Sequence, residues 1–316
     1  MGKTERIAKS LGAKEQPADC VPRWRALVRS LYPIRVISHR SLRGPFDRET
    51  FLDAMTAVHR EAAMGEGLRE KAVGIWKLER ICFSYCRDGN RTLHGIDLPP
   101  EVQPISHTGL GFAATELAGF CAEGISGLIE SCAHPDFRQF AYESIGCIWA
   151  LQSTRVYRSI FRALSRTRIP RTRLTPWAEF VDKFPADVQG LLAHGHGRAL
   201  YLKKFNLGSA VREAIALEGL DSSAAMQGIA FAYAMLNNGD LDRILDVGAD
   251  FRNEELRERF QSGLVAALVF WDWTFPGFLD GLHPRSSRQE GLLDKAHERI
   301  GTCRRAGRLT NWLIGA

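Results

Sequence analysis

The fold of this chain is best predicted from residues 190–245, GLLAHGHGRALYLKKFNLGSAVREAIALEGLDSSAAMQGIAFAYAMLNNGDLDRIL. Apolar residues recur at steps of three and four, as on one face of an α-helix. Glycine and alanine are interleaved with them, and small residues at such spacing either let helices approach closely or leave room for a ligand. The stretch therefore predicts closely packed helices that carry two histidines and an arginine.

An earlier stretch, residues 108–152, follows the same plan. Both stretches close on a helix with an aromatic–Ala–Tyr segment, Phe140-Ala141-Tyr142 in the first and Phe231-Ala232-Tyr233 in the second. This similarity predicts internal pseudo-repeats at about 108–152 and 188–245, although shared helix composition would also explain much of it. A duplication would place Glu143 and either Gln227 or Ala234 in comparable surroundings.

The rest of the chain also has helical spacing, and strand-like alternation never lasts more than a few residues. We therefore expect an all-α protein, either a multi-helix bundle or a helical-repeat-like array. The domain prediction is a flexible leader at 1–20, basic N-terminal helices at 21–90 and a main helical domain at 105–316. The loop RDGNRTLHGIDLPPEVQP, with its glycines and prolines, separates the last two.

Composition indicates a globular, cytoplasmic protein. Of the 316 residues, 45% are hydrophobic and 25% charged, and the longest apolar run, near Leu264–Trp271, is too short to span a membrane. The first residues lack the apolar centre of a signal peptide. The seven cysteines are scattered, so we expect reduced thiols, with Cys121 and Cys147 among the buried ones. Cys82 and Cys86 have no second pair at ligand spacing, and no metal or cofactor is expected.

Positive charge is concentrated in two segments. Residues 1–48 hold eleven Lys/Arg and four Asp/Glu, and residues 151–175 hold seven arginines and no acid. Four of these arginines share one face of a predicted helix, and they form either an anion-binding surface or a solvated face: Arg155, Arg158, Arg162 and Arg166. The helix around Trp24 has an apolar stripe and a basic rim, so it either docks on the core or contacts a membrane or partner peripherally. Nucleic acid is not expected, because aromatic residues are scarce in these segments.

Three segments resemble a known family: FAYESIGCIWAL, FPADVQGLLAHGHGRALYL and IALEGLDSSAAMQGIAFAYAMLNNG. The resemblance is to a domain-of-unknown-function family of enediyne biosynthesis proteins. The matching residues are Phe140, Ala141, Tyr142, Glu143, Gly146, Gly195, Gly197, Arg198, Leu200, Tyr201, Gly228, Ala230, Ala232 and Tyr233. About 110 residues are covered, and the N-terminal RWRALVRSLYPIRVISHRSLRG also looks like that family. The chain departs from it by an arginine-rich segment where the family has glycine-rich sequence. The resemblance implies a context, polyketide or polyene metabolism, more than a reaction.

His194-Gly195-His196-Gly197-Arg198 is the best local candidate for chemistry. Histidine moves protons near neutral pH, and arginine can clamp a carboxylate or phosphate. Two histidines two residues apart on a helix point about 200° apart and cannot face one metal. Glu143 lies in an apolar helix and needs a partner, for which Arg198 is the natural choice, although a role as general acid or base stays open. The candidate catalytic residues are His194, His196 and Glu143; the candidate substrate-binding residues are Arg198, Tyr142, Tyr201 and Tyr233.

Three functions fit these observations. The first is an accessory biosynthetic protein or enzyme that holds an apolar intermediate in a helical cavity. The second is a non-catalytic helical module that binds an anionic membrane surface or a partner protein. The third is an isoprenoid cyclase-like enzyme, suggested by Asp240, Asp242 and Asp246, although capping of the next helix is the simpler explanation of these aspartates. Whether the chain forms a homo-oligomer stays open.

Overall fold

The computed structural model describes residues 44–65, 67–88, 92–153, 174–237, 241–247, 251 and 253–309. Within these ranges no residue belongs to a β-strand, and the predicted all-α, multi-helix class is confirmed. The helices are α3 (Arg48–Met64), α4 (Leu68–Arg87), η2 (Pro100–Val102), α5 (Gln103–Leu117), α6 (Ala122–Cys132), η3 (Pro135–Phe137), α7 (Arg138–Gln152), α9 (Trp177–Val181), α10 (Ala186–Lys204), α11 (Leu207–Ala216), α12 (Ser222–Leu236), α13 (Leu241–Asp246), α14 (Glu254–Thr274), η4 (Leu279–Gly281) and α15 (Ser287–Ala306).

Many of these helices begin at a side chain that caps the first turn. Asp47 and Thr50 form a reciprocal capping box at α3. The side chains of Asp221, Asn253 and Ser286 accept hydrogen bonds from backbone N–H groups at the starts of α12, α14 and α15. Each such cap is worth about 1 kcal/mol, so the start of each of these helices is set by local sequence.

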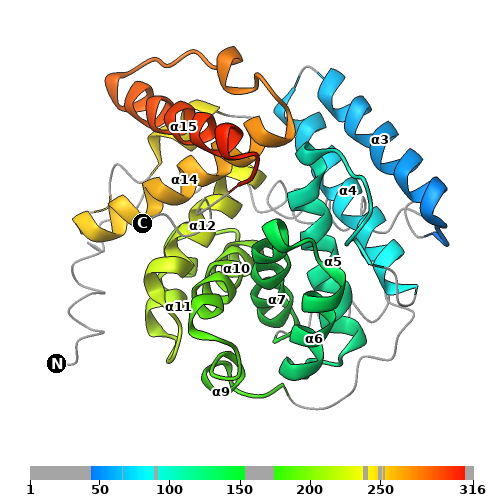
Figure 1. Ribbon diagram of the computed structural model, residues 1–316. Coiled ribbons are helices and arrows are strands. Elements are labelled where there is room, and N and C mark those ends of the chain that lie inside the picture. The colour runs from blue at the N-terminus through cyan, green and yellow to red at the C-terminus, as the bar shows by residue number, and fades with distance from the viewer. Residues whose placement is uncertain are drawn as a thin grey trace.

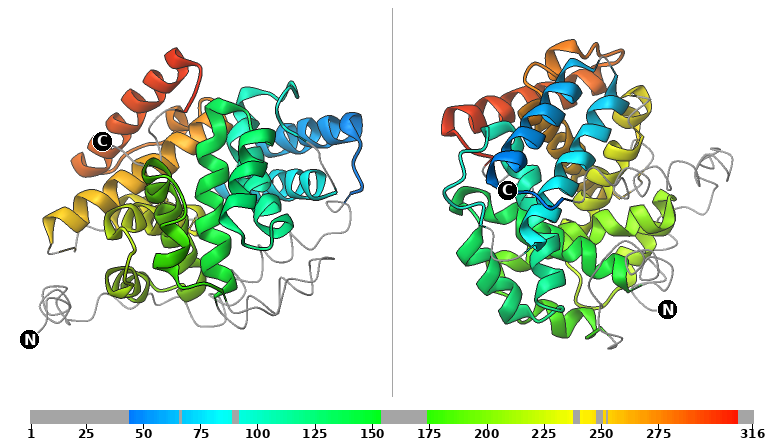
Figure 2. Two further views of the ribbon diagram at one scale, coloured as in Figure 1. Left: turned by 60° about the horizontal axis from the view of Figure 1, so that its bottom comes forward. Right: turned by 90° about the vertical axis from the view of Figure 1, so that its right-hand side faces the viewer.

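Six long helices lie side by side in the order α4, α5, α7, α10, α12, α14, with α3 outside α4 and α15 outside α14 (Figures 1 and 2). Each of these six helices therefore packs on the long helix that precedes it and on the one that follows it in the chain. One continuous core runs through the whole array, from Phe46 to Leu309. It includes α4 of the basic N-terminal segment and α5 of the main segment, which pack directly on each other.

Glycines sit where these helices cross. A methyl group added at any of them would overlap the backbone of the facing helix, so each marks a backbone-to-backbone contact. The crossings are Gly109 on Glu79, Gly111 on Ala141, Gly146 on Leu192, Gly195 on Glu143, Gly197 on Ala225, Gly228 on His194 and Gly263 on Gln227. Of the two readings of the small residues, close approach is therefore the one found at these crossings.

Helix α10 is the centre of the array. Gly195 faces α7, and Gly197 faces α12 on the other side. The paired contacts run in opposite directions along the two chains, so α10 is antiparallel to both neighbours. The predicted pseudo-repeats place α7 and α12 in matching positions, and both do flank α10. The duplication itself stays a prediction.

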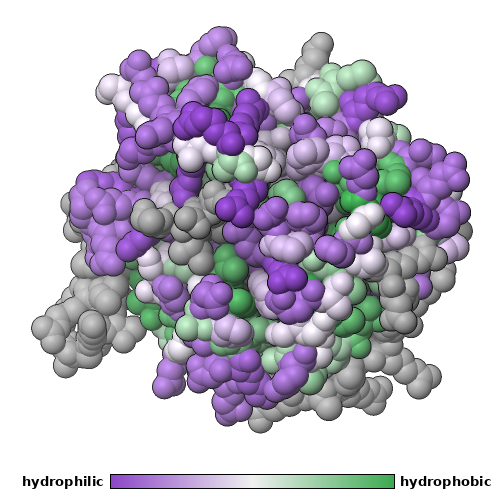
Figure 3. All heavy atoms as spheres, in the orientation of Figure 1, coloured by the Kyte–Doolittle hydropathy of each residue, from purple (hydrophilic) through white to green (hydrophobic). Residues whose placement is uncertain are grey.

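The surface of the described part is mainly polar. The face in Figure 3 is largely covered by hydrophilic residues, with small, separate hydrophobic patches. Met64 and Leu117 are the large hydrophobic side chains that are well exposed among the described residues. None of the helices in the described part combines the length and hydropathy needed to cross a bilayer.

Candidate functional site

Helix α10 carries the residues that the sequence singled out. Asp187 lies in its first turn and Lys203 and Lys204 in its last, so side-chain charges oppose the helix dipole at both ends. The glycines draw α7 and α12 against its middle turns. His194, His196 and Arg198 are thereby held inside the array.

Glu143 of α7 is the partner of both His194 and Arg198. Its Oε1 lies 3.1 Å from Nδ1 of His194, and its Oε2 lies 3.2 Å from a guanidinium nitrogen of Arg198. The side chains of Glu143 and His194 are 3% and 0% exposed, while that of Arg198 is 15% exposed. The predicted Arg198–Glu143 ion pair is confirmed, and it joins α7 to α10.

The Glu143–His194 pair has the form of an oriented base. An ionised carboxylate only accepts hydrogen bonds, so Nδ1 of His194 carries a hydrogen and donates a hydrogen bond to Glu143. Among the described residues, Nε2 of His194 has no hydrogen-bond partner. The ring is, however, fully buried and packs edge-on against Phe231, with ring centroids 5.9 Å apart. The imidazole is therefore enclosed by protein, which suits an interior polar network better than proton exchange with a substrate.

Arg198 also interacts with two groups that the sequence did not single out. Burial works to lower its pKa, but the carboxylate of Glu143, with Cys147 and Glu79, outweighs this effect and raises the pKa above its usual value. Burial raises the pKa of Cys147 to about 11, which keeps it a thiol. The guanidinium is therefore a fixed positive charge between two helices that carry acids, α4 and α7.

Glu79 is the residue that sequence reasoning missed. Burial of its carboxyl group raises its pKa to about 7; Arg198 lowers it and Glu143 raises it further. A signal was present, because Glu79 lies four residues after Ile75 and three before Cys82, both on the buried face of α4. An acid on the apolar stripe of an amphipathic helix predicts a buried partner.

We expect Glu79 to make stability fall as the pH rises. Its folded pKa of about 7 lies above the usual glutamate value of 4.5, so between these pH values the folded protein holds a proton that the unfolded chain has already lost. Unfolding then releases a proton, and this contribution to stability is lost between about pH 4.5 and about pH 7. The wild type should therefore have a higher urea midpoint at about pH 5 than at about pH 8, and this difference should become smaller in Glu79→Gln. The exposed control Glu298→Gln should keep the wild-type difference, and equal pH profiles for all three proteins would contradict the assignment.

His196 points away from His194. Its ring lies 4.4 Å from that of Trp177 and 5.6 Å from that of Trp149 (centroid distances), whereas His194 faces Glu143. The two histidines thus occupy different sides of α10, as predicted from their spacing. Burial lowers the pKa of His196 to about 3, so this ring is neutral near pH 7 and unsuited to proton transfer there.

The candidate tyrosines do not form one site. The hydroxyl of Tyr142 donates to Glu130 of α6 at 3.0 Å, and burial raises its pKa to about 12. Tyr201 and Tyr233 contact each other at 5.4 Å between ring centroids, where Tyr201 accepts a hydrogen bond from Asn237. The grouping of Tyr142 with the other two is therefore not found, because it faces α6 while they meet between α10 and α12.

Two predicted sites fall outside the described residues: the arginine face at Arg155, Arg158, Arg162 and Arg166, and the helix around Trp24. In the part of the chain that the structure describes, no group of three or more His, Cys, Asp or Glu side chains is arranged to hold a metal. Cys82, Cys86 and Cys147 are buried thiols. Cys121 is not in the core as predicted but exposed, because the chain turns there before α6.

The acidic residues near 240 hold helices together. Asp242 forms an ion pair with Arg285 at 2.5 Å, and Asp246 accepts a hydrogen bond from Gln289 at 3.1 Å. Both partners lie at the start of α15, while Asp240 is outside the described residues. These two carboxylates therefore dock α13 on α15, a role that neither the capping nor the cyclase interpretation predicted.

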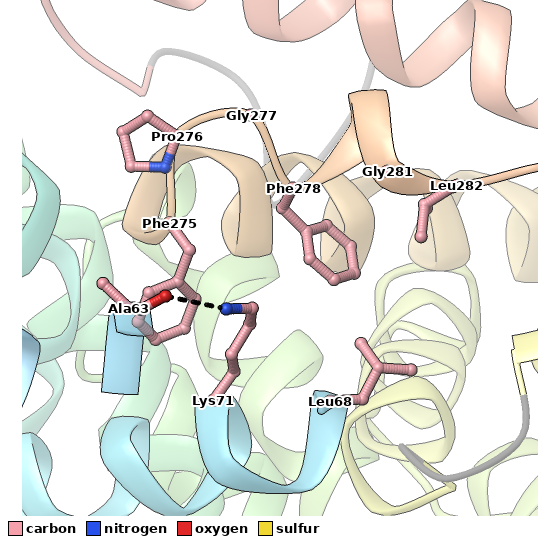
Figure 4. Close-up of a pocket in the computed structure, with 9 residues that line it drawn as sticks. All are labelled: Ala63, Leu68, Lys71, Phe275, Pro276, Gly277, Phe278, Gly281 and Leu282. Atoms are coloured by element: carbon pink, nitrogen blue, oxygen red, sulfur yellow. Dashed lines mark hydrogen bonds between the residues drawn. The ribbon is translucent and has the colours of Figure 1, made fainter. Parts of the chain in front are cut away.

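A pocket that the sequence did not predict lies between the α3–α4 turn and the loop after α14. Its volume is about 320 Å³, and its walls come from two groups of residues (Figure 4): Ala63, Leu68 and Lys71 on one side, and Phe275, Pro276, Gly277, Phe278, Gly281 and Leu282 on the other. The lining is mostly apolar, with one cationic side chain. The sequence signal was the Pro276-Gly277 turn between two phenylalanines, which marks a loop with apolar residues on both flanks.

The loop after α14, which forms one wall of the pocket, is held in place by contacts with α14 and α15. Asp272 is 3% exposed; it accepts a hydrogen bond from the backbone N–H of Leu279 at 2.9 Å and pairs with Arg304 of α15 at 2.6 Å. Gly277 has φ +83, a conformation that side chains rarely adopt, which lets the loop turn back. The aromatic residues of the loop are therefore held in place by α14 and α15.

Comparison of the chain with protein-family models, with curated proteins and with solved structures gives no match.

Proposed function

We propose that this protein is an accessory binding protein that holds an apolar small molecule in the pocket between α4 and the loop after α14. One observation carries the proposal: the pocket of about 320 Å³ lined by Leu68, Phe275, Phe278 and Leu282. Small-molecule sites in proteins are concave and mostly apolar, with a few polar groups, and this volume lies at the small end of their usual range.

The pocket also supports a binding role because it is separate from the buried polar network. His194 and Glu143 are enclosed between helices that meet through glycines. A ligand in the pocket would contact none of them, so the proposal is for binding without catalysis. If the resemblance to enediyne biosynthesis proteins holds, the ligand would be a polyketide or polyene intermediate, or a fragment of such a molecule.

A neutral apolar probe tests this function. We expect 1-octanol to bind on the order of 1 mM, as judged by ligand-observed NMR titration. Leu68→Glu should weaken this binding at least tenfold, because it places a carboxylate in the apolar wall. A glutamate in the first turn of α4 is compatible with the helix dipole, so the fold should survive.

Leu117→Glu is the matched control. Leu117 is a leucine at the end of helix α5, more exposed than the half-buried Leu68, and it does not line the pocket. It should bind 1-octanol as the wild type does. If 1-octanol does not bind, or if Leu68→Glu binds it unchanged, the pocket is not a ligand site and the proposed function is wrong.

A further inference from the structure

Lys71 is the cationic residue that lines the pocket, and only two of the three N–H donors of its ammonium group have acceptors among the described residues. Nζ donates to the backbone oxygens of Gly65 at 2.9 Å and Ala63 at 3.2 Å, at the end of α3. An ammonium group has three N–H donors, so one is left. Figure 4 shows this group in the middle of the pocket, between Phe275 and Phe278.

The positive charge of Lys71 lacks an anionic partner within the described residues. Its two hydrogen-bond acceptors are neutral carbonyls, and the part of the chain that the structure describes contains no ion pair to it. Burial lowers the pKa of Lys71, only partly offset by Glu70. An ammonium short of counter-charge beside apolar walls is where an anion would gain most from binding.

The aromatic wall next to this charge is already in place. The ring of Phe275 stacks on His59, with centroids 5.8 Å apart, and Nζ of Lys71 lies 5.2 Å from the same ring. Nε2 of His59 is 2.7 Å from the backbone oxygen of Thr274, which fixes the imidazole behind the wall. Phe278 rests on Trp271, with centroids 5.3 Å apart. A ligand would meet a prearranged apolar surface and lose little free energy to ordering it.

We propose that the ligand of this pocket is an amphipathic carboxylate, whose apolar body lies against Phe275, Phe278 and Leu68 and whose carboxylate accepts a hydrogen bond from Nζ of Lys71. This inference rests on the proposed function and names the chemical class of its ligand. A helix-capping role for Lys71 accounts for the two carbonyl contacts. It leaves the third N–H donor, on a side chain that lines the pocket, without an acceptor among the described residues.

Three probes with the same tail test the head group: octanoate, 1-octanol and octylammonium. We expect octanoate to bind the wild type about tenfold tighter than 1-octanol, since one charge-assisted hydrogen bond at a partly open site has about this effect. Octylammonium should bind more weakly than 1-octanol, because like charges repel. The octanoate preference should shrink at high salt, and the affinity for 1-octanol should not.

Variants of Lys71 assign the preference to this residue. Lys71→Met keeps the apolar part of the side chain but removes the charge, so this variant should bind octanoate no more tightly than 1-octanol. Lys71→Arg keeps the charge and should still bind octanoate more tightly than 1-octanol. Lys77→Met is the control, because Lys77 is on the same helix, pairs with Glu61 and does not line the pocket. It should bind all three probes as the wild type does.

Each outcome separates the two proposals. If 1-octanol binds and octanoate binds no tighter, the carboxylate assignment is overturned and the proposed function stands. A preference that survives in Lys71→Met also overturns the assignment. Should Lys71→Met fail to fold, the wild-type comparison decides, since octylammonium binding as tightly as octanoate excludes recognition of an anion. If none of the probes binds, the proposed function itself fails.

Discussion

Gly195→Ala should prevent folding or cost more than about 4 kcal/mol of stability. The added methyl group would overlap the backbone carbonyl of Glu143, and backbone atoms in the centre of the array cannot swing aside as a side-chain tip can. Separating α7 from α10 would also lengthen the contacts of Glu143 with His194 and Arg198. We expect insoluble protein, or a urea midpoint far below that of the wild type.

Two other glycines serve as matched controls for this prediction. Gly127 in α6 and Gly291 in α15 are also helical, but an added methyl group would meet no atom nearby. Alanine at either position should stabilise the protein by about 0.5–1 kcal/mol through helix propensity. If Gly195→Ala behaves like these two, the helices do not touch through their backbones and the described packing is wrong.

Arg198→Ala should destabilise the protein by about 3–5 kcal/mol. The substitution leaves the carboxylate of Glu143, 3% exposed, with His194 as its remaining partner and without a fixed positive charge. Glu79 loses the charge that favours its ionised form at the same time. Chemical unfolding near neutral pH measures the loss, and Arg212→Ala, an exposed position on α11, should change stability by less than about 0.5 kcal/mol.

A double variant tells an unpaired charge from a lost side chain. Glu143→Gln keeps a hydrogen-bond acceptor for His194 and removes the negative charge. Adding it to Arg198→Ala should recover at least about 1 kcal/mol relative to the sum of the two single changes. Strict additivity would mean that Arg198 stabilises the fold by packing alone.

Local patterns predicted the helices and the link between them. Periodicity and capping residues such as Asp47 and Asp221 are read within a few neighbouring positions, so the class and approximate bounds of the helices follow from the sequence. The pair of Glu143 and Arg198 was also predictable, because each is a charge in a helix that is otherwise apolar or small. The opposite directions of His194 and His196 follow from the helical period alone.

Other features depend on how distant segments meet, which periodicity does not encode. Tyr142 shares an aromatic–Ala–Tyr pattern with Tyr233, yet the two face different helices because α7 and α12 lie on opposite sides of α10. The pocket joins Lys71 to Phe275, about two hundred positions further along the chain. Glu79 could have been found from the sequence, because it lies among the apolar positions of α4, but its partner Arg198 is on a helix far along the chain.

The glycines on two sides of α10 set a limit on how this protein can change its length. Removing or adding one residue before Gly195 would rotate the remainder of the helix by about 100° relative to its start. Gly195 and Gly197 would then turn away from α7 and α12 together, and larger side chains would be driven into both contacts. Insertions and deletions are therefore tolerable in the connections between helices and not within α10. In a library of single-codon deletions, we expect every deletion within α10 to abolish stable folding.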